Sequence, residues 1–410
     1  MSMSQTQQQN MPALRFPEFS EEWLQDSLGE FFSFKNGVNA DKSAYGKGHK
    51  FINVLDIISD RPITSEYIIG SVTITDKEFE KYKVVYGDIL FQRSSETREE
   101  VGQSNVYLDR DKPATFGGFV IRGHPRKDFN AEYFHSLLKT AKVRKDMTSR
   151  SGGSTRYNVG QESLSKTSVD VAPTFPEQQK IASFLSSVDR KIVQLGKKKA
   201  LLEQYKKAMM QKLFSQELRF KDAQGNDFPD WEEKRLGDVF EERIERNNFE
   251  QEMLSVTLSK GILPANEVGR HDTSPTDKSK YKRVKHGDIA YNSMRMWQGA
   301  SGVSKYEGIV SPAYTVIKSL GETNTDFFGY YFKLTKVIQT FQRNSQGLTS
   351  DTWNLKFPAL SRIKLDVPSP PEQQKIADFL SSIDRKIDLV ATELDHAKSF
   401  KKGLLQQMFI

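Results

Sequence analysis

Seventeen residues occur twice in this chain with almost no change, and this repeat constrains the fold more than any other feature. PEQQKIASFLSSVDRKI runs over 176–192 and PEQQKIADFLSSIDRKI over 371–387, with only two of the seventeen positions different. The offset of 195 residues is too long for a solenoid, whose repeats run to roughly 20–50 residues. The repeat therefore indicates two copies of one module, each a domain followed by the same helix.

Apolar residues recur every seven positions in each copy, which is typical of long helices that pair as a coiled coil. Thr174 and Ser369 precede the helices, each with a glutamate three residues later, so we expect a capping box at each start. Because the order is domain, helix, domain, helix, we expect the helices to pack antiparallel with pseudo-two-fold symmetry. The heptad positions are Ile181, Val188, Leu195, Leu202 and Met209 with Leu185, Ile192, Lys199, Lys206 and Leu213, and then Ile376, Ile383, Val390, Ala397 and Leu404 with Leu380, Ile387, Leu394, Lys401 and Met408.

The stretches outside the repeated helices predict two domains of mixed character. The predicted fold class is α+β, with two mixed α/β domains separated by two long antiparallel coiled-coil helices. The expected strands lie at 84–86, 89–91, 119–121 and 315–317, and the expected helices at 131–142 and 325–340. We expect a disordered tail at 1–13, the first domain at 14–175, the central helix at 176–217, the second domain at 218–370 and the C-terminal helix at 371–410.

Composition excludes several classes of chemistry. The chain has no cysteine, which excludes disulfides, thiolate metal sites and cysteine nucleophiles. Its six histidines show none of the spacings of zinc sites, and no nucleotide-binding glycine motif occurs. The sequence shows no signal peptide and no apolar run near the roughly 20 residues of a membrane span, so we expect a cytoplasmic protein without a membrane partner. These absences predict a non-catalytic chain without a cofactor.

The balance of charge favours a polyanionic partner. Lysine and arginine exceed aspartate and glutamate, which gives a formal net charge of +7. A basic chain with two related halves suits double-stranded DNA, whose backbone also has two-fold symmetry. Because two copies of one scaffold carry different loops, we expect each copy to recognise a different ligand sequence.

Two polar segments in each domain hold the candidate DNA-binding residues. One follows the strand after a Gly-Asp pair, at 92–98 and 292–298, and the other is a later loop, at 150–158 and 343–349. Amide side chains can pair with adenine and arginine with guanine in the major groove, although ordinary surface loops are also polar. The candidates are Gln92, Arg93, Ser95, Arg98, Arg150, Arg156, Asn158, Asn292, Arg295, Gln298, Arg343 and Thr349.

Together these features resemble the specificity subunit of type I restriction–modification enzymes, over about residues 14–410. The resemblance rests on the Pro-Glu-Gln-Gln-Lys-Ile runs from Pro176 and Pro371 and on the Gly-Asp elements from Gly87 and Gly287. It implies that each domain is a target-recognition domain for one half of a split DNA site, and that the helices act as a ruler for the unread spacer. It also implies two methyltransferase subunits bound along the helices, and restriction subunits in the full complex.

Two other interpretations remain open. A stand-alone two-domain DNA-binding protein would need no partner surface, whereas the repeated helix starts favour a shared docking site. An unrecognised nuclease would need clustered carboxylates or histidines, and the sequence shows no such cluster. The predicted partner-docking residues are Glu177, Gln178, Gln179, Glu372, Gln373 and Gln374.

Overall fold

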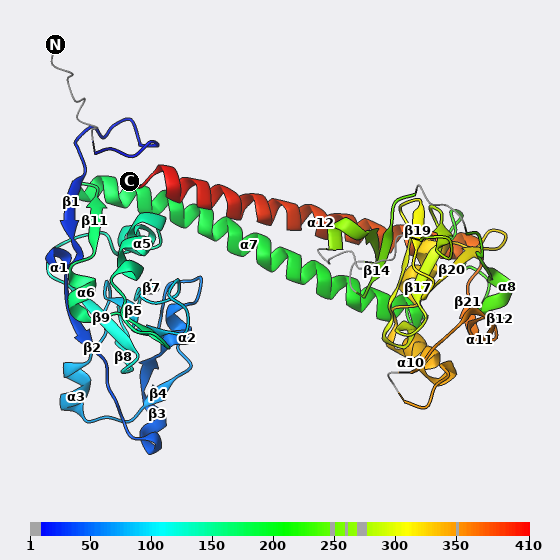
Figure 1. Cartoon of the computed structure of the whole chain (residues 1–410), viewed down its shortest axis with the longest axis horizontal. Helices are drawn as coiled ribbons and strands as arrows, with labels where there is room; N and C mark the ends of the chain where they lie inside the picture. The colour runs from blue at the N-terminus through cyan, green and yellow to red at the C-terminus, as the bar shows by residue number, and fades with distance from the viewer. Residues whose placement is uncertain (1–9, 247–250, 259–260, 269–276, 350–351) are drawn as a thin grey trace, which may run out of the picture. The chain divides into compact units, whose positions relative to one another are not determined.

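The computed structural model describes residues 10–246, 251–258, 261–268, 277–349 and 352–410 (Figure 1). The chain divides into two compact units, which we call unit 1 and unit 2. Unit 1 comprises residues 1–196 and 392–410, and unit 2 comprises residues 197–391. Each unit therefore holds one mixed domain together with a part of both long helices. Within the described ranges, no helix has the length and apolar character needed to cross a membrane.

Both units are built on an antiparallel sheet with the same strand order. In unit 1 the described strands follow the order β2 (Phe32–Asn36), β9 (Val120–Pro125), β5 (Ile89–Gln92) and β7 (Ser104–Val106). In unit 2 they follow the order β13 (Phe240–Glu242), β20 (Tyr314–Ser319), β17 (Ile289–Asn292) and β18 (Ser301–Val303). The matching order shows that the two domains are copies of one scaffold, as the repeat predicts.

One interior strand of each sheet, β5 in unit 1 and β17 in unit 2, lies between two hydrophobic cores, because successive side chains point to opposite faces. Ile89 and Phe91 of β5 pack in a core with the helices of unit 1, whereas Leu90 packs in a second core. In unit 2, Ile289 of β17 packs in the helix-side core, and Ala290 packs in the other. The strand ends, where the polar segments begin, are therefore fixed from both faces.

Smaller elements complete each unit. In unit 1 they are β1 (Leu24–Ser27) paired with β11 (Ser168–Val171), β3 (Tyr45–Ile52) between β4 (Ser71–Val72) and β8 (Thr115–Phe116), β6 (Ser94–Ser95) paired with β10 (Tyr157–Asn158), and helices α1 (Leu28–Phe31), α2 (Val54–Ile57), α3 (Asp76–Lys81) and α6 (Gln161–Ser165). In unit 2 they are β12 (Glu232–Arg235) paired with β21 (Lys364–Val367), β14 (Leu254–Thr257) with β15 (Gly261–Pro264), β16 (Lys282–Val284) with β19 (Gly308–Val310), and helices α8 (Leu236–Val239) and α11 (Phe357–Leu360).

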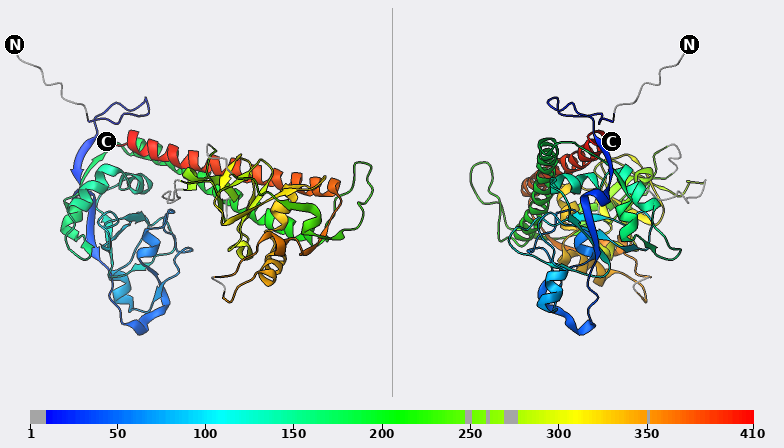
Figure 2. Two further views of the ribbon diagram at one scale, coloured as in Figure 1. Left: turned by 45° about the vertical axis from the view of Figure 1, so that its right-hand side comes forward. Right: turned by 90° about the vertical axis from the view of Figure 1, so that its left-hand side faces the viewer.

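The two repeated helices pack against each other in opposite directions within each unit (Figures 1 and 2). They are α7 (Phe175–Phe214) and α12 (Pro370–Gln407). In unit 1, Ile181 near the start of α7 shares a core with Met408 just past the end of α12. In unit 2, Leu213 near the end of α7 shares a core with Ile376 near the start of α12. The predicted antiparallel pairing and the fold class are thereby confirmed.

Two of the three lysines at heptad positions face aspartates of the other long helix, whereas Lys199 pairs with Glu203 of its own helix at 2.7 Å. Lys401 of α12 pairs with Asp189 of α7 at 2.6 Å in unit 1. Lys206 of α7 pairs with Asp384 of α12 at 2.6 Å in unit 2. The two ion pairs are related by the 195-residue offset of the repeat. A charged residue in an otherwise apolar seam favours one register, because any other alignment leaves it without its partner.

Two segments that we expected to be single helices are each divided in two. They are α4 (Ala131–Leu137) with α5 (Ala141–Ser149), and α9 (Thr325–Tyr331) with α10 (Thr335–Asn344). In one continuous helix, Val337 would lie roughly 140° around the axis from Phe332, yet both side chains are buried in the same core. An extended residue at Leu334, with φ −72° and ψ 137°, redirects the chain and resolves this conflict. Thr140 has the same role in unit 1.

The strand expected at 84–86 was also wrong, since Val84 forms only an isolated bridge with Ala114. The next backbone N–H, that of Val85, donates to the Asp88 carboxylate at 2.9 Å instead of extending a ladder.

The expected capping boxes do not form reciprocally. Thr174 Oγ1 accepts from Glu177 N at 3.4 Å, but the Glu177 carboxylate binds elsewhere in unit 1. The hydroxyl of Ser369 has no hydrogen-bond partner among the described residues. A carboxylate binds a guanidinium more strongly than a backbone N–H, and Arg15 supplies one to Glu177.

Candidate nucleic-acid interface

The Gly-Asp pairs form the same turn in both units, immediately before the strand that carries the first polar segment. Gly87 and Gly287 have φ of 90° and 84°, in the left-handed region that glycine enters without strain. The following carboxylate closes the turn, since Asp88 and Asp288 each accept from the backbone N–H three residues earlier, at 2.9 and 2.7 Å. The motif therefore defines where β5 and β17 begin.

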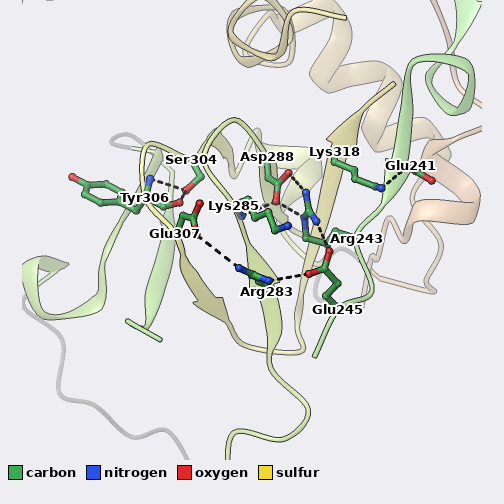
Figure 3. Close-up of polar contacts among 10 residues, drawn as sticks. All are labelled: Glu241, Arg243, Glu245, Arg283, Lys285, Asp288, Ser304, Tyr306, Glu307 and Lys318. Carbon is green, nitrogen blue, oxygen red and sulfur yellow. Dashed lines mark hydrogen bonds and ion pairs between the residues drawn. The ribbon is translucent and has the colours of Figure 1, made fainter. Parts of the chain in front are cut away.

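Each of these buried aspartates also binds a side chain from another part of its unit. Asp88 lies 2.6 Å from His124 Nδ1 in unit 1. Asp288 accepts from Arg243 Nε at 2.6 Å and Nη2 at 2.9 Å, and these bonds raise the pKa of Arg243 (Figure 3). Arg243 also reaches Glu245, so its guanidinium lies between two carboxylates. This role of the Gly-Asp motif is structural, since it fixes the strands that end in the candidate segments.

The two polar segments of unit 1, which the sequence presents far apart, form one continuous surface. The pairing of β6 with β10 sets Ser94 opposite Asn158, and their side chains are hydrogen-bonded. The backbone N–H of Val159 donates to Arg93 O at 3.0 Å. Arg98 Nε donates to Thr148 O at 3.2 Å. Residues 92–98 therefore lie beside residues 150–158 in unit 1.

The predicted residues of this surface differ in exposure. Gln92 is 6% exposed and its Nε2 donates to Ser94 O at 2.9 Å. Ser95 is 8% exposed and donates to Glu100 at 2.9 Å, so both residues shape the segment from within. Arg93 is half-buried, and its Nη1 donates to Gly118 O at 3.3 Å. The predicted residues that are exposed are Arg98, Arg150, Arg156 and Asn158.

Unit 2 brings its two polar segments together with the equivalent backbone bond. The N–H of Leu355, after the second segment, donates to Ser293 O at 2.8 Å. Asn292 is half-buried and its Oδ1 accepts from Met294 N at 3.0 Å, which shapes the turn. The predicted residues that are exposed in unit 2 are Arg295, Gln298, Arg343 and Thr349.

The sequence analysis missed an aromatic pair on this surface. The rings of Trp297 and Trp353 meet edge to face, with centroids 5.2 Å apart, and both side chains are partly exposed. Tryptophan in an otherwise polar segment was the available signal, since partly exposed aromatic rings are favoured where a ligand binds. Trp297 follows Arg295 closely, so the pair borders the candidate base-reading residues.

The glutamates that open the repeated helices, predicted to dock a partner, bind their own units instead. Glu177 is 1% exposed and accepts from Arg15 Nε at 2.7 Å, from Arg15 Nη2 at 2.9 Å and from Trp23 Nε1 at 3.1 Å. Glu372 is also 1% exposed and accepts from Arg219 at 3.1 and 2.8 Å. Each carboxylate therefore joins its helix to a Leu-Arg-Phe segment near the start of the same module, at 14–16 in the first and 218–220 in the second.

The first glutamine of each run is likewise engaged within its unit. Gln178 Oε1 accepts from Asn130 N at 3.0 Å, and Gln373 Oε1 accepts from Asn324 N at 2.9 Å. Both asparagines are helix N-caps, so these bonds position α4 and α9 against the long helices. The exposed members of the predicted docking set are Gln179 and Gln374.

Comparison with known proteins identifies the family of this duplicated scaffold. The family described as "Type I restriction modification DNA specificity domain" matches residues 20–204 and 229–399, which is most of the chain. The chain belongs to this family. It is a type I restriction–modification specificity subunit with two DNA-recognition domains, as the resemblance in the sequence implied.

One relative and two solved structures match the chain over almost its whole length. A protein of Methanocaldococcus jannaschii, provisionally named the type I restriction enzyme MjaX specificity subunit, is 24% identical over 97% of this chain and 95% of its own. The crystal structure of the type I restriction–modification system S subunit from M. genitalium is 15% identical, with a TM-score of 0.61 over 98% of this chain and 99% of that one. A structure from a study of type I R-M complex assembly has a TM-score of 0.53, with 14% identity, over 94% and 97%. The two structures support the fold of this specificity subunit.

Proposed function

We propose that each domain of this specificity subunit reads one half of a bipartite site in double-stranded DNA. The observation that carries the proposal is the matched surface in the two units, where the segment after β5 or β17 lies beside a later loop. The two surfaces share their backbone bonds but differ in side chains, with Arg98 and Arg156 in unit 1 against Arg295 and Gln298 in unit 2. Guanidinium and amide groups suit base edges, so different residues at one position imply different target bases.

The proposal includes partner subunits. The chemistry of modification would come from two methyltransferase subunits docked along α7 and α12, with restriction subunits added in a full complex. The exposed Gln179 and Gln374, at equivalent places on the two helices, are the docking residues that we propose. Since α7 continues without interruption from unit 1 into unit 2, we propose that the helices set the length of the unread spacer. The chain itself would be non-catalytic and located in the cytoplasm.

A library of DNA duplexes randomised at both half-sites tests the proposal. Arg93→Ala and Arg98→Ala are expected to weaken or relax recognition of one half-site, and Asn292→Ala and Arg295→Ala the other. A lost bidentate contact costs roughly 1–3 kcal/mol at its base pair. Lys145→Met, on the exposed side of α5, is the matched control and should change neither preference. Substitutions that alter both half-sites equally, or neither, would show that these segments are not base readers.

A further inference from the structure

We call residues 92–101 of unit 1 and 292–301 of unit 2 the recognition segments, since each extends a first polar segment by three residues. A side-chain cation holds the end of the recognition segment in unit 1. Arg144, in α5, directs its Nη2 at two backbone carbonyls, those of Glu99 at 2.8 Å and Val101 at 2.7 Å. These carbonyls close the segment that begins at Gln92. Arg144 is partly buried, and this burial lowers the pKa of its guanidinium. Burying a charged guanidinium costs free energy, so its position indicates that the two hydrogen bonds of Arg144 are structurally important.

Unit 2 shows the same arrangement with a different cation. Lys333, in the turn between α9 and α10, donates from Nζ to Gly299 O at 2.6 Å and to Ser301 O at 2.7 Å. It also approaches Leu258 O at 3.4 Å. Burial lowers the pKa of Lys333 to about 8. These carbonyls close the segment that begins at Asn292.

The carbonyls occupy equivalent positions in the two domains, although the donors do not. Glu99 and Val101 lie twelve and fourteen residues after Gly87, and Gly299 and Ser301 lie twelve and fourteen residues after Gly287. The donors occupy different places, because Arg144 lies within α5 whereas Lys333 lies just before α10. Counted from the residue that caps each helix, the place of Arg144 in α5 corresponds to Ile338 in α10.

Ile338 cannot donate a hydrogen bond, and its side chain lies against Gly299. The lysine just before α10 supplies the donor in its place. In unit 1, the lysine at that same place, Lys139, is bonded to His135 instead. The same pair of carbonyls is therefore held in both domains by unrelated side chains.

We propose that Arg144 and Lys333 are positioning residues for DNA recognition, each holding the recognition segment of its own domain in the conformation that reads bases. We call each arrangement a carbonyl clasp. The inference rests on the proposed function, since it assumes that these segments contact DNA. A side chain that fixes a loop by two backbone contacts limits the directions in which the loop's exposed side chains can point. Loss of the clasp should therefore reduce discrimination between bases more than it reduces binding to DNA in general.

The test uses the complete chain in its complex with modification subunits and compares affinities for the full target and for targets with single base changes. Lys333→Met removes the donor while keeping a long side chain, and it should reduce discrimination several-fold in one half-site only. Arg144→Met should do the same in the other half-site. Lys333→Arg and Arg144→Lys, which retain a donor, should restore most of the discrimination. The matched controls are two exposed lysines, Lys336→Met in α10, three residues after Lys333, and Lys145→Met in α5, next to Arg144.

The outcomes separate positioning from stability. If Lys333→Met lowered only the amount of folded protein, the affinity ratios in both half-sites would be unchanged and the proposal would be overturned. If Lys333→Met did not fold, Lys333→Gln, whose amide can still donate to one carbonyl, should show a smaller loss confined to the same half-site. Equal losses in both half-sites would also overturn the proposal. A wild-type complex that selects no DNA sequence at all would instead contradict the proposed function itself.

Discussion

At the scale of single residues, the ion pair between Arg15 and Glu177 joins the start of module 1 to its helix. Both side chains are almost buried, at 10% and 1% exposure, and the pairing is bidentate. Among the described residues, Arg15→Met would leave the Glu177 carboxylate with the Trp23 indole N–H as its one side-chain donor. Removing one partner of a buried pair costs about 3–5 kcal/mol, because the remaining charge is desolvated without compensation. We expect a loss of this size in the stability of unit 1, measured by unfolding in urea.

Two other variants define what the Arg15 result means. Arg126→Met, at an exposed arginine of the same unit, is the control and should leave the urea midpoint unchanged. Arg219→Met, at the equivalent pair in unit 2, should cost less, because Arg219 is 22% exposed. A loss below 1 kcal/mol for Arg15→Met would indicate that the pair adds little to the stability of unit 1.

A second residue-scale prediction concerns pH. Lys139 donates to His135 Nε2 at 3.0 Å, and its pKa is lowered to about 8 by burial and by the charge of Lys401. Its pKa in the unfolded chain is about 10.4, so between these values the unfolded state binds more protons than the folded state. The stability contributed by Lys139 therefore increases as pH rises from about 8 to 10 and is lost as pH falls.

Unfolding in urea at pH 7, 8, 9 and 10 checks this sign. The buried tyrosine Tyr133, whose pKa burial raises, opposes the trend only above pH ~10, where the unfolded tyrosine ionises. The stability of the wild type relative to Lys139→Met should therefore increase over the range. Lys145→Met, at an exposed lysine of the following helix, should run parallel to the wild type. A difference between wild type and Lys139→Met that is constant with pH would contradict the assignment.

At the scale of elements, each long helix carries one lysine that meets an aspartate across the seam. In unit 2, Asp384 accepts from Lys206 at 2.6 and 2.7 Å and from Tyr330 Oη at 2.7 Å. A double-mutant cycle with Lys206→Met and Asp384→Asn should give a coupling energy of about 0.5–1 kcal/mol, because the pair is partly exposed. The coupling should weaken in high salt.

Lys207 provides the matched control for this cycle, since it is exposed on the same helix, one residue along. Lys207→Met combined with Asp384→Asn should be additive in unfolding free energy. Coupling of the same size at Lys207 would mean that Asp384 responds to the general positive charge of α7 and not to one partner.

Elements were predictable from the sequence where a long pattern repeated. The heptads of α7 and α12 extend over many turns, so their existence and direction followed from periodicity and module order. The division at Leu334 was not predictable in that way, because one extended residue between two short helices leaves the local composition helical. The sequence also could not predict whether the Gln92 side chain is buried or exposed, since that depends on the segment that folds over it. The pairing of β6 with β10 joins residues more than sixty positions apart, which no local pattern reports.

At the scale of the whole molecule, the two modules have two equivalent junctions. Peptide chain connects the end of α7 to the second module, which we call the closed junction, whereas none connects the end of α12 to the first module, which we call the open junction. Where α7 ends, the N–H of Leu218 donates to Lys212 O at 3.1 Å as the chain enters the second module. In unit 1, the N–H of Leu14 donates to Gln407 O at 2.8 Å, although no peptide chain joins them directly. Gln407 is the counterpart of Lys212 in the repeat, and Leu14 is that of Leu218. The open junction therefore has the geometry of the closed one.

This equivalence predicts that circular permutation is tolerated. In the closed junction, Gln216 and Glu217 connect Ser215, the counterpart of Ile410, to Leu218. A linker of about two residues between Ile410 and Leu14 should therefore suffice, and a longer glycine–serine linker should add no stability.

New ends opened at the exposed residues 215–217 disturb no buried backbone, since chain breaks are best tolerated at such sites. We expect the permutant to fold and to keep the DNA target of the parent in methylation or binding assays. A second permutant, opened within β5, removes a central strand and should fail to fold. If the permutant opened at 215–217 also failed, or selected a different target, the two junctions would not be equivalent.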